Sequence, residues 1–318
     1  MRYRALLTAL LTALLACLGA CVAPEELADE DAEEEVAEDE AEVKGGVRFE
    51  VLQHNIAAGA KSSTGAAALR YTFAQIDARK PDVVMLEEVC ASQVPIIKAK
   101  YPRWNVYFSQ MSAAHPGCGG PKGQVLATHR PLRDVFIEDL GDVDPNLEKH
   151  FTLLCGDVMK GGKKVLACAT HLRAGGYGEP GSEALAARGR QIVRIKQILA
   201  ARVRAGRAVV VAGDFNTRPH EPLLDPLYRL TRSGERKGGP FEEADQTDDR
   251  RERFANNADG RVKCAPKACR SGQPTMGGHK IDHVFFSRNR VAGLLNAEVL
   301  GSGASDHKLL YASAVLDL

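Results

Sequence analysis

The chain has 318 residues, of which 44% are hydrophobic and 26% are charged, enough to build one large globular domain or two ordinary ones. This composition excludes collagen-like, coiled-coil and wholly disordered proteins, and the sequence has no internal repeat of fixed period. Beyond the N-terminus, no apolar stretch reaches the roughly 18 residues that indicate a transmembrane helix.

The net charge of +1 conceals two oppositely charged parts. The whole chain has 42 Lys and Arg and 41 Asp and Glu, and residues 1–43 contain two of the basic and twelve of the acidic residues. Residues 44–318 therefore keep 40 basic and 29 acidic residues, a surplus of 11 positive charges. Such a surplus favours an anionic partner for this part of the chain, with a merely soluble basic surface as the alternative.

Residues 1–20 have the order of a secretory signal peptide. Two early arginines precede an uncharged stretch over Ala5–Leu18, which is too short to span a bilayer of roughly 30 Å as a helix. Leu18-Gly19-Ala20-Cys21 resembles a bacterial lipobox, which implies lipidation of Cys21; a plain signal peptide cut nearby is the alternative. We therefore expect export and a lipid anchor in the bacterial envelope, and by the same resemblance Val22 favours the outer membrane or cell surface.

Residues 21–46 are acidic, rich in alanine and almost free of large apolar residues. Such a segment repels itself and buries too little surface to fold, so we expect a disordered linker. A globular domain should then occupy residues 47–318, with an irregular insertion at about 233–274, where glycine, charge and asparagine replace the apolar pattern.

The globular part is predicted to alternate strands with few helices, which indicates a layered α/β fold. Its expected strands are Phe49–Asn55, Val83–Leu86, Trp104–Ser109, Val125–Thr128, Phe151–Met159, Val165–His171, Val209–Asp214, Asp282–Ser287 and Leu309–Leu316.

Two helices are predicted, over Ala66–Ala78 and Glu183–Arg204. The second repeats apolar residues at helical spacing. Its basic residues are expected on the solvent-exposed face: Arg188, Arg190, Arg194, Lys196, Arg202 and Arg204.

Six cysteines remain once Cys17 is removed with the signal peptide and Cys21 is assigned to lipid. An even number is typical of an oxidising compartment. A zinc site is the alternative, but the sequence contains no CxxC pair to support it.

One cysteine pair follows from strand geometry. A two-residue hairpin loop at Gly161-Gly162 places Cys155 opposite Cys168, with Cα atoms about 4.5 Å apart, which a disulfide can bridge. Cys264–Cys269 would then close a short surface loop, and this leaves Cys90–Cys118 as the third pair.

Polar residues gather where the predicted strands begin or end, which is where α/β folds assemble their sites. The clusters are His54-Asn55, Glu87-Glu88, Thr170-His171-Leu172, Gly213-Asp214-Phe215-Asn216, Ile281-Asp282-His283 and Ser305-Asp306-His307. Any one of them alone could be a helix cap, a turn or a buried polar group. Six together are difficult to explain as packing.

The residue types of these clusters suit a single chemistry. Glu88, Asp214 and Asn216 offer the oxygen ligands that Mg²⁺, Mn²⁺ or Ca²⁺ prefer. His171 and His307 provide an acid and a base, or hydrogen bonds to phosphate oxygens, and Asp282 or Asp306 would orient an imidazole. Metal-assisted attack of water on phosphorus needs this set of groups.

The ordered series resembles the endonuclease/exonuclease/phosphatase superfamily over about residues 47–318. The matching motifs are Asn55 at a strand end, Leu86-Glu87-Glu88-Val89, Gly123-Gln124-Val125-Leu126-Ala127-Thr128-His129-Arg130-Pro131-Leu132, Thr170-His171-Leu172, Gly213-Asp214-Phe215-Asn216, Ile281-Asp282-His283-Val284 and Ser305-Asp306-His307. The resemblance implies a four-layered α/β sandwich of two packed, mainly antiparallel sheets flanked by helices. It also implies a metal-dependent phosphodiesterase, with Mg²⁺ as the first choice of cofactor and Mn²⁺ or Ca²⁺ as alternatives.

The resemblance also implies roles for these residues. Glu88, with Asn55 and Asp306, would hold the metal, while Asp214 and Asn216 would position or activate the water. The other three residues would complete catalysis. His307, oriented by Asp282, would act as base or charge stabiliser, and His171 as a phosphate ligand or acid. Four further histidines near the motifs are expected to be structural or to contact substrate: His54, His150, His279 and His283.

Three positions depart from the family pattern. Glu87 replaces the usual Gln and adds a negative charge, Gln124 replaces the usual Asn, and Ala57 stands where some members have an Asp. The last change places a second metal ligand there in doubt.

The sequence leaves the substrate open. A nuclease suits the basic body, since phosphate contacts supply most non-specific affinity for nucleic acid. A lipid phosphodiesterase or phosphatase, of the sphingomyelinase or phosphoinositide phosphatase kind, suits a membrane tether. A non-catalytic binding module is the third alternative, against which the intact motif series argues. No protein partner is inferred.

Overall fold

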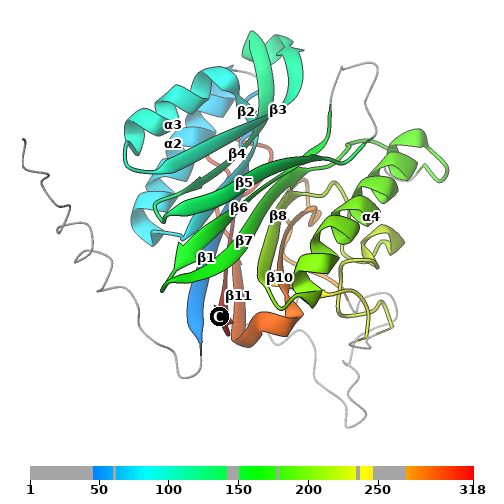
Figure 1. Cartoon of the computed structure of the whole chain (residues 1–318). Coiled ribbons are helices and arrows are strands. Elements are labelled where there is room, and N and C mark those ends of the chain that lie inside the picture. The colour runs from blue at the N-terminus through cyan, green and yellow to red at the C-terminus, as the bar shows by residue number, and fades with distance from the viewer. Residues whose placement is uncertain (1–45, 60–61, 142–149, 177–178, 234–236, 246–269) are drawn as a thin grey trace, which may run out of the picture. The chain divides into compact units, whose positions relative to one another are not determined.

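The computed structural model describes residues 46–59, 62–141, 150–176, 179–233, 237–245 and 270–318. Within these ranges the chain forms two six-stranded sheets (Figure 1). The predicted signal segment, the linker with Cys21, and the Cys264–Cys269 pair lie outside the described residues.

The first sheet carries the N-terminal and C-terminal strands of the domain. In spatial order it consists of β11 (Val291–Val299), β12 (Leu310–Leu316), β1 (Val47–Asn55), β2 (Val83–Cys90), β4 (Gly120–Thr128) and β3 (Asn105–His115). Only β1 and β2 run parallel, and the crossover helix α2 (Ser62–Arg79) joins them.

The second sheet repeats this plan. Its order is β5 (Leu132–Asp139), β6 (Thr152–Lys160), β7 (Lys163–His171), β8 (Ala208–Asp214), β10 (Asp282–Ser287) and β9 (Phe241–Glu243). Here β7 and β8 are the parallel pair, and α4 (Glu183–Arg204) joins them. Each sheet therefore contains one βαβ unit within an otherwise antiparallel array.

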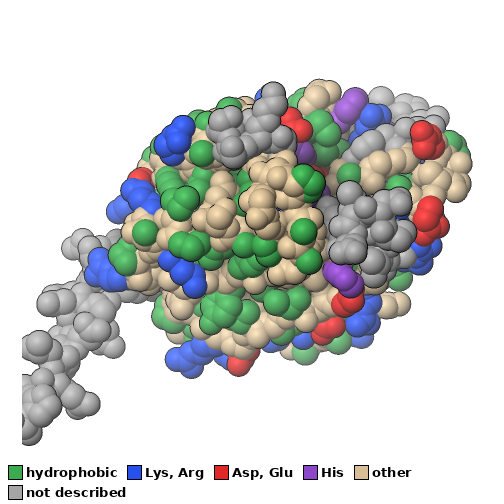
Figure 2. Space-filling model, turned by 90° about the horizontal axis from the view of Figure 1, so that it is seen from above, with side chains coloured by type: hydrophobic (Ala, Val, Ile, Leu, Met, Phe, Trp, Pro, Cys, Tyr) green, Lys and Arg blue, Asp and Glu red, His purple; other side chains and the backbone are tan. Residues whose placement is uncertain are grey.

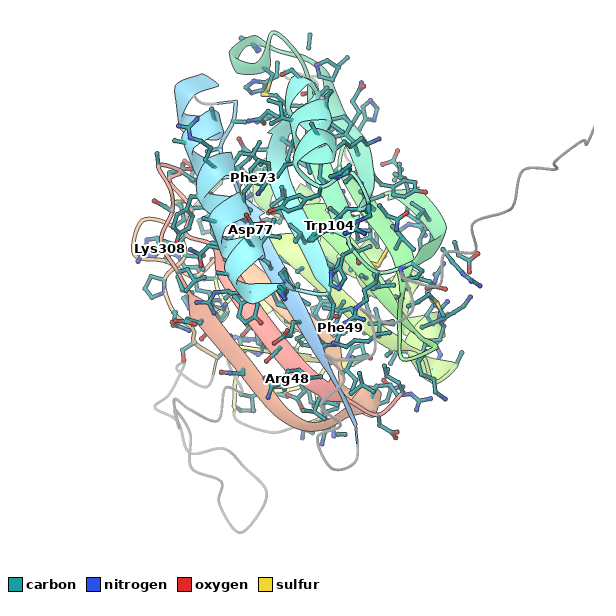
Figure 3. The ribbon with its side chains drawn as sticks, turned by 90° about the vertical axis from the view of Figure 1, so that its left-hand side faces the viewer. Arg48, Phe49, Phe73, Asp77, Trp104 and Lys308 are labelled. Atoms are coloured by element: carbon teal, nitrogen blue, oxygen red, sulfur yellow. A yellow bond between two sulfur atoms is a disulfide. The ribbon has the colours of Figure 1, made fainter. Side chains whose placement is uncertain are left out.

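Three apolar clusters bind the layers together. The largest lies between the two sheets and includes Phe49, Met85 and Phe286, all fully buried. A second fills the space between the second sheet and α4, and a third joins the first sheet to α2 and α3 (Val94–Lys100), seen face-on in Figure 3. The four-layered sandwich is thereby confirmed. None of the described helices is long and apolar enough to cross a membrane.

The β6–β7 hairpin has the register expected from its loop. Gly161 and Gly162 both have positive φ, 55° and 70°, as a two-residue type I′ turn requires. Cys155 consequently faces Cys168, and the two form a disulfide with Cα atoms 4.1 Å apart. The Cys90–Cys118 pair is also present, with a Cα separation of 5.3 Å.

The structure adds four elements that the sequence did not predict: α3, β5, β9 and β11. All three strands, β5, β9 and β11, are outer strands of their sheets, so each pairs with a strand on one side only, and their sequences mix polar or charged residues with apolar ones. The three-residue β9 lies inside the segment expected to be irregular. All four elements are peripheral, so they do not change the placement of the site.

The expectation that Arg188 is exposed was wrong. Its side chain is fully buried, and Nη1 donates to the carbonyl oxygens of Arg173 and Gly175, each at 2.8 Å. The helical spacing contained the signal, because position 188 is three residues after Leu185 and four before Ile192, on the apolar face of α4. Arg188 thus fastens the loop that follows His171.

Candidate active site

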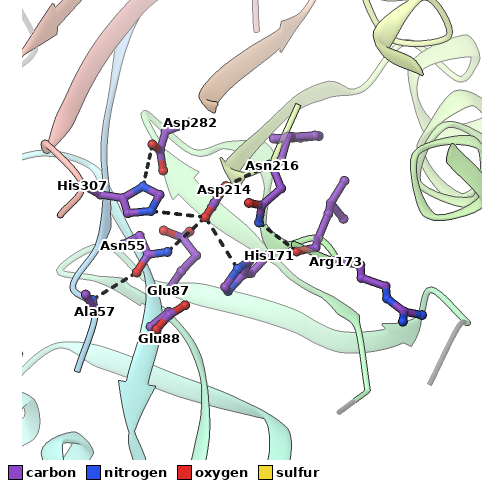
Figure 4. Close-up of polar contacts among 12 residues, drawn as sticks. Asn55, Ala57, Glu87, Glu88, His171, Arg173, Asp214, Asn216, Asp282 and His307 are labelled. Atoms are coloured by element: carbon purple, nitrogen blue, oxygen red, sulfur yellow. Dashed lines mark hydrogen bonds and ion pairs between the residues drawn. The ribbon is translucent and has the colours of Figure 1, made fainter. Parts of the chain in front are cut away.

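Two parallel strand pairs, one in each sheet, end at the same edge of the sandwich. Asn55 at the end of β1 lies beside Glu87 of β2, and His171 at the end of β7 lies beside Asp214 at the end of β8. Asp282 opens β10 directly opposite Asp214. Since parallel strands bring their carboxyl ends to one edge, segments far apart in sequence converge there (Figure 4).

Close contact between β7 and β8 requires a glycine before Asp214. A Cβ atom at Gly213 would lie 1.8 Å from the carbonyl oxygen of Thr170, which no side chain permits. Gly213 therefore allows the two strands to pair up to His171 and Asp214. The glycine of the Gly-Asp-Phe-Asn motif has this packing role.

His307 and Asp282 form a hydrogen-bonded pair. The His307 Nδ1 atom is 2.9 Å from Oδ2 of Asp282, and Gln53 donates to the other carboxylate oxygen at 3.0 Å. Burial alone would lower the pKa of His307. The negative charges of Asp282 and Asp214 outweigh this effect and raise that pKa to about 10. Burial alone would raise the pKa of Asp282, but the charge and the hydrogen bond of His307 lower it below its usual range. The pair is therefore an imidazolium and a carboxylate near neutral pH.

Asp214 lies at the centre of the cluster. Its Oδ2 atom is 3.6 Å from Nε2 of both His171 and His307 and accepts a hydrogen bond from Asn55 Nδ2 at 3.1 Å. The backbone N–H of Asn216 donates to Oδ1 at 2.8 Å. Burial raises the pKa of Asp214 to about 7, against the lowering effect of the His307 charge. Asp214 is thus held between the two imidazoles.

The two glutamates of β2 point to different places because the strand is irregular there. The pairing of β2 with β4 shifts between Leu86 and Val89, and Glu88 has a φ of 57°. Glu87 is fully buried and accepts from Gln53 at 2.7 Å, and burial, with the charge of Asp282, raises its pKa well above the usual range. Glu88 is half-buried at the Asn55 end of the cluster, where Lys122 contacts it.

Two polar side chains hold the site together, and the sequence analysis had not singled out one of them, Gln53. Gln53 donates to both Glu87 and Asp282, so one amide joins the two sheets. The Ser305 hydroxyl donates to the Asn55 carbonyl at 2.7 Å and accepts from the His307 N–H at 3.1 Å. For Gln53, its position two residues before Asn55 on the same face of β1 was the available signal.

Other predicted positions lie around this cluster. Asp306 is exposed, and its charge acts on His307. His54 is fully buried, contacts Thr72 and the His307 carbonyl, and has a pKa lowered to about 4 by burial.

The other three histidines near the motifs, and Gln124, lie outside the central cluster. His283 is buried against the Thr217 carbonyl, whereas His150 and His279 are exposed. Gln124 donates across the sheets to the Thr152 and Ala169 carbonyls, which is a structural role.

The donor set fits a hard divalent cation. Ligand atoms of Asp214, Asp282 and His307 lie within 4.8 Å of one another, but Asp282 is already held by His307 and Gln53. The other end of the cluster offers the Glu88 carboxylate and the Asn55 amide oxygen, which accepts one hydrogen bond from Ala57 N–H. Oxygen donors beside several carboxylates suit Mg²⁺, Mn²⁺ or Ca²⁺. The catalytic and ligand roles of the individual residues stay predictions.

A family model described as the endonuclease/exonuclease/phosphatase family matches residues 52–307. The chain belongs to this family, which includes phosphodiesterases and nucleases, hydrolases of phosphoester bonds. Among proteins of curated function, none matches the chain in sequence.

Solved structures with the same fold agree with this assignment. The endonuclease/exonuclease/phosphatase from Bacteroides vulgatus is 14% identical, with a TM-score of 0.60, covering 85% of this chain and 99% of that one. The human Nocturnin catalytic domain, solved with a bound sulfate anion, is 19% identical, with a TM-score of 0.59 and coverages of 85% and 94%. D. rerio TDP2, complexed with a single-strand DNA product, is 17% identical, with a TM-score of 0.56 and coverages of 84% and 98%. At these identities the likeness establishes the fold alone.

We predict that Asp282→Asn lowers the turnover of bis-p-nitrophenyl phosphate by about 100-fold or more, because the amide cannot stabilise a charged His307. The measurement is initial rate against substrate concentration with Mg²⁺ present. Asp134→Asn, at an exposed ion pair with Lys164, is the control and should keep the wild-type rate. Unchanged turnover in Asp282→Asn would remove the pair from the mechanism.

Proposed function

We propose that the protein is a divalent-metal-dependent phosphodiesterase whose substrate is nucleic acid. The observation that carries the proposal is the convergence of His171, Asp214 and the Asp282–His307 pair, with Glu88 at the Asn55 end of the same cluster. These groups match the demands of phosphoester hydrolysis: one acceptor for a water proton, fixed positive charge for the phosphoryl oxygens, and a cation site.

Each side chain has a role that its contacts support. Asp214, with one oxygen held by the Asn216 N–H and the other between the imidazoles, orients the attacking water and accepts its proton. The His307 imidazolium, fixed by Asp282, offers an N–H to a phosphoryl oxygen. His171 contacts the phosphoryl group from the second sheet.

Glu88 and Asn55 would hold the cation, with Asp306 as a further ligand from the exposed side. When bound, such an ion polarises the phosphoryl oxygens and offsets the charge that develops on them. Mg²⁺ is the expected ion, and Mn²⁺ or Ca²⁺ would suit the same oxygen donors. Asn216 keeps the end of β8 against the end of β7, since its Nδ2 donates to the Leu172 carbonyl at 3.0 Å.

Nucleic acid is favoured over lipid on two grounds. The domain has a strong positive surplus, and a protein of the same fold, D. rerio TDP2, is complexed with a single-strand DNA product. On the face shown in Figure 2, the described Lys and Arg side chains lie mainly around the border rather than in one patch. The alternative remains a lipid phosphodiesterase or phosphatase.

We predict Mg²⁺-dependent cleavage of DNA or RNA by the purified protein, abolished by EDTA and restored by added Mg²⁺. The assay compares single-stranded DNA, plasmid DNA, RNA and sphingomyelin vesicles, each with Mg²⁺ and with EDTA. His307→Ala should abolish cleavage and serves as the check against contaminating nucleases. Turnover of sphingomyelin without nucleic-acid cleavage would favour the lipid alternative, and silence on every substrate would favour the binding module.

We propose further that the protein is exported and anchored to the bacterial envelope by lipid at Cys21. The support is the sequence of residues 1–21 and the cysteine pairs at Cys90–Cys118 and Cys155–Cys168, which are typical of an oxidising compartment. In an expressing Gram-negative host, the wild type should fractionate with membranes and Cys21→Ser should not. Retention of both forms in the cytoplasm would contradict export.

A further inference from the structure

A buried lysine contacts the predicted metal ligand. The Nζ atom of Lys122 is 3.0 Å from Oε2 of Glu88, and the two side chains are only 10% and 23% exposed. Burying an ammonium is costly unless it is paired, so this contact differs from the exposed ion pairs on the surface, which contribute little. The charge of Glu88 is therefore already compensated by a residue of the chain itself.

The surrounding structure keeps Lys122 in this place. On β4 it lies between Cys90 of β2 and Ser112 of β3, so its backbone is fixed on both sides. The loop after Asn55 packs on its aliphatic stem, since a Cβ atom at Gly59 would lie 3.0 Å from the Lys122 Cδ. The disulfide between Cys90 and Cys118 holds the neighbouring turn in position. The backbone and the aliphatic stem of Lys122 are thus held beside Glu88.

We infer that Lys122 competes with the divalent cation for the Glu88 carboxylate and so sets how weakly the protein binds its metal. The inference rests on the proposed function, which makes Glu88 a ligand. An ion at Glu88 would lie a few ångströms from the ammonium, where two positive charges repel strongly in a partly buried site. Lys122 must therefore withdraw from Oε2, at a cost that lowers the affinity for the ion.

The opposite role makes the opposite prediction. If Lys122 served only to hold the Glu88 carboxylate in the conformation that binds metal, removing its ammonium would weaken metal binding. If the contact were incidental, removal would change nothing. The sign of the change in metal affinity therefore separates competition from support, and no turnover measurement is needed.

In the experiment, Mn²⁺ is titrated into the metal-stripped full-length protein. Binding is measured by calorimetry and by the loss of the EPR signal of free Mn²⁺. Lys122→Met, which keeps the length of the side chain and removes its charge, should tighten Mn²⁺ binding by about ten-fold or more. Lys122→Arg, which keeps the charge, should bind like the wild type. Lys164→Met, which removes a lysine from the exposed pair with Asp134, is the matched control and should also bind like the wild type.

A double-mutant cycle completes the test. In a Glu88→Gln background, Lys122→Met should lose most of its effect on Mn²⁺ affinity, because there is no longer a carboxylate to compete for. Thermal unfolding establishes that each variant is folded, and Lys122→Gln replaces Lys122→Met if the latter is not. Unchanged or weaker Mn²⁺ binding in the neutral variants would overturn the inference. Tighter binding in a protein that cleaves no phosphoester would uphold it and contradict the proposed function instead.

Discussion

Concentrated negative charge at one edge of the sandwich is the constraint on which the rest of the site depends. Two parallel strand pairs and the start of β10 bring Glu87, Glu88, Asp214 and Asp282 to this edge. Burial makes four ionised carboxylates untenable there without compensation. The raised pKa of Glu87, the pKa of about 7 at Asp214 and the imidazolium of His307 are the chain's responses to this constraint.

The same constraint divides the site into two halves with different chemistry. On one side, Asp214 lies between His171 and a His307 whose orientation Asp282 and Ser305 fix. On the other, Asn55 and Glu88 carry the side-chain oxygens proposed to hold a cation, and Lys122 supplies a positive charge. A phosphoryl group between the halves would meet a proton acceptor, a proton donor and a cation site. Weak metal binding caused by Lys122 would suit a protein that works where divalent ions are abundant, as the proposed export implies.

The sequence indicated which residues converge at this edge, because they lie at strand ends, while their catalytic and ligand roles stay predictions. His171, Asp214 and Asp282 each stand where an apolar run ends or begins, and Gly161-Gly162 determined the register that pairs Cys155 with Cys168. The outer strands β5 and β11 were not predicted from the sequence. Each pairs with a neighbouring strand on one side only, and its sequence mixes polar and apolar residues instead of forming an apolar run. Contacts across the fold escaped too: nothing local indicates that Lys122 reaches Glu88 or that Gln53 bridges to Asp282. The error at Arg188 had another cause. Its helical spacing indicated the buried face of α4, but its charge led to the expectation that it is exposed.

The most direct test of the central claim is a crystal structure of the protein with Mn²⁺ and vanadate, using anomalous scattering to locate the metal. We expect the metal peak at the Glu88 and Asn55 oxygens, with vanadate between it and the nitrogens of His171 and His307. The Lys122 ammonium should have moved away from Glu88 Oε2. A metal peak elsewhere, with vanadate out of reach of both imidazoles, would contradict the account.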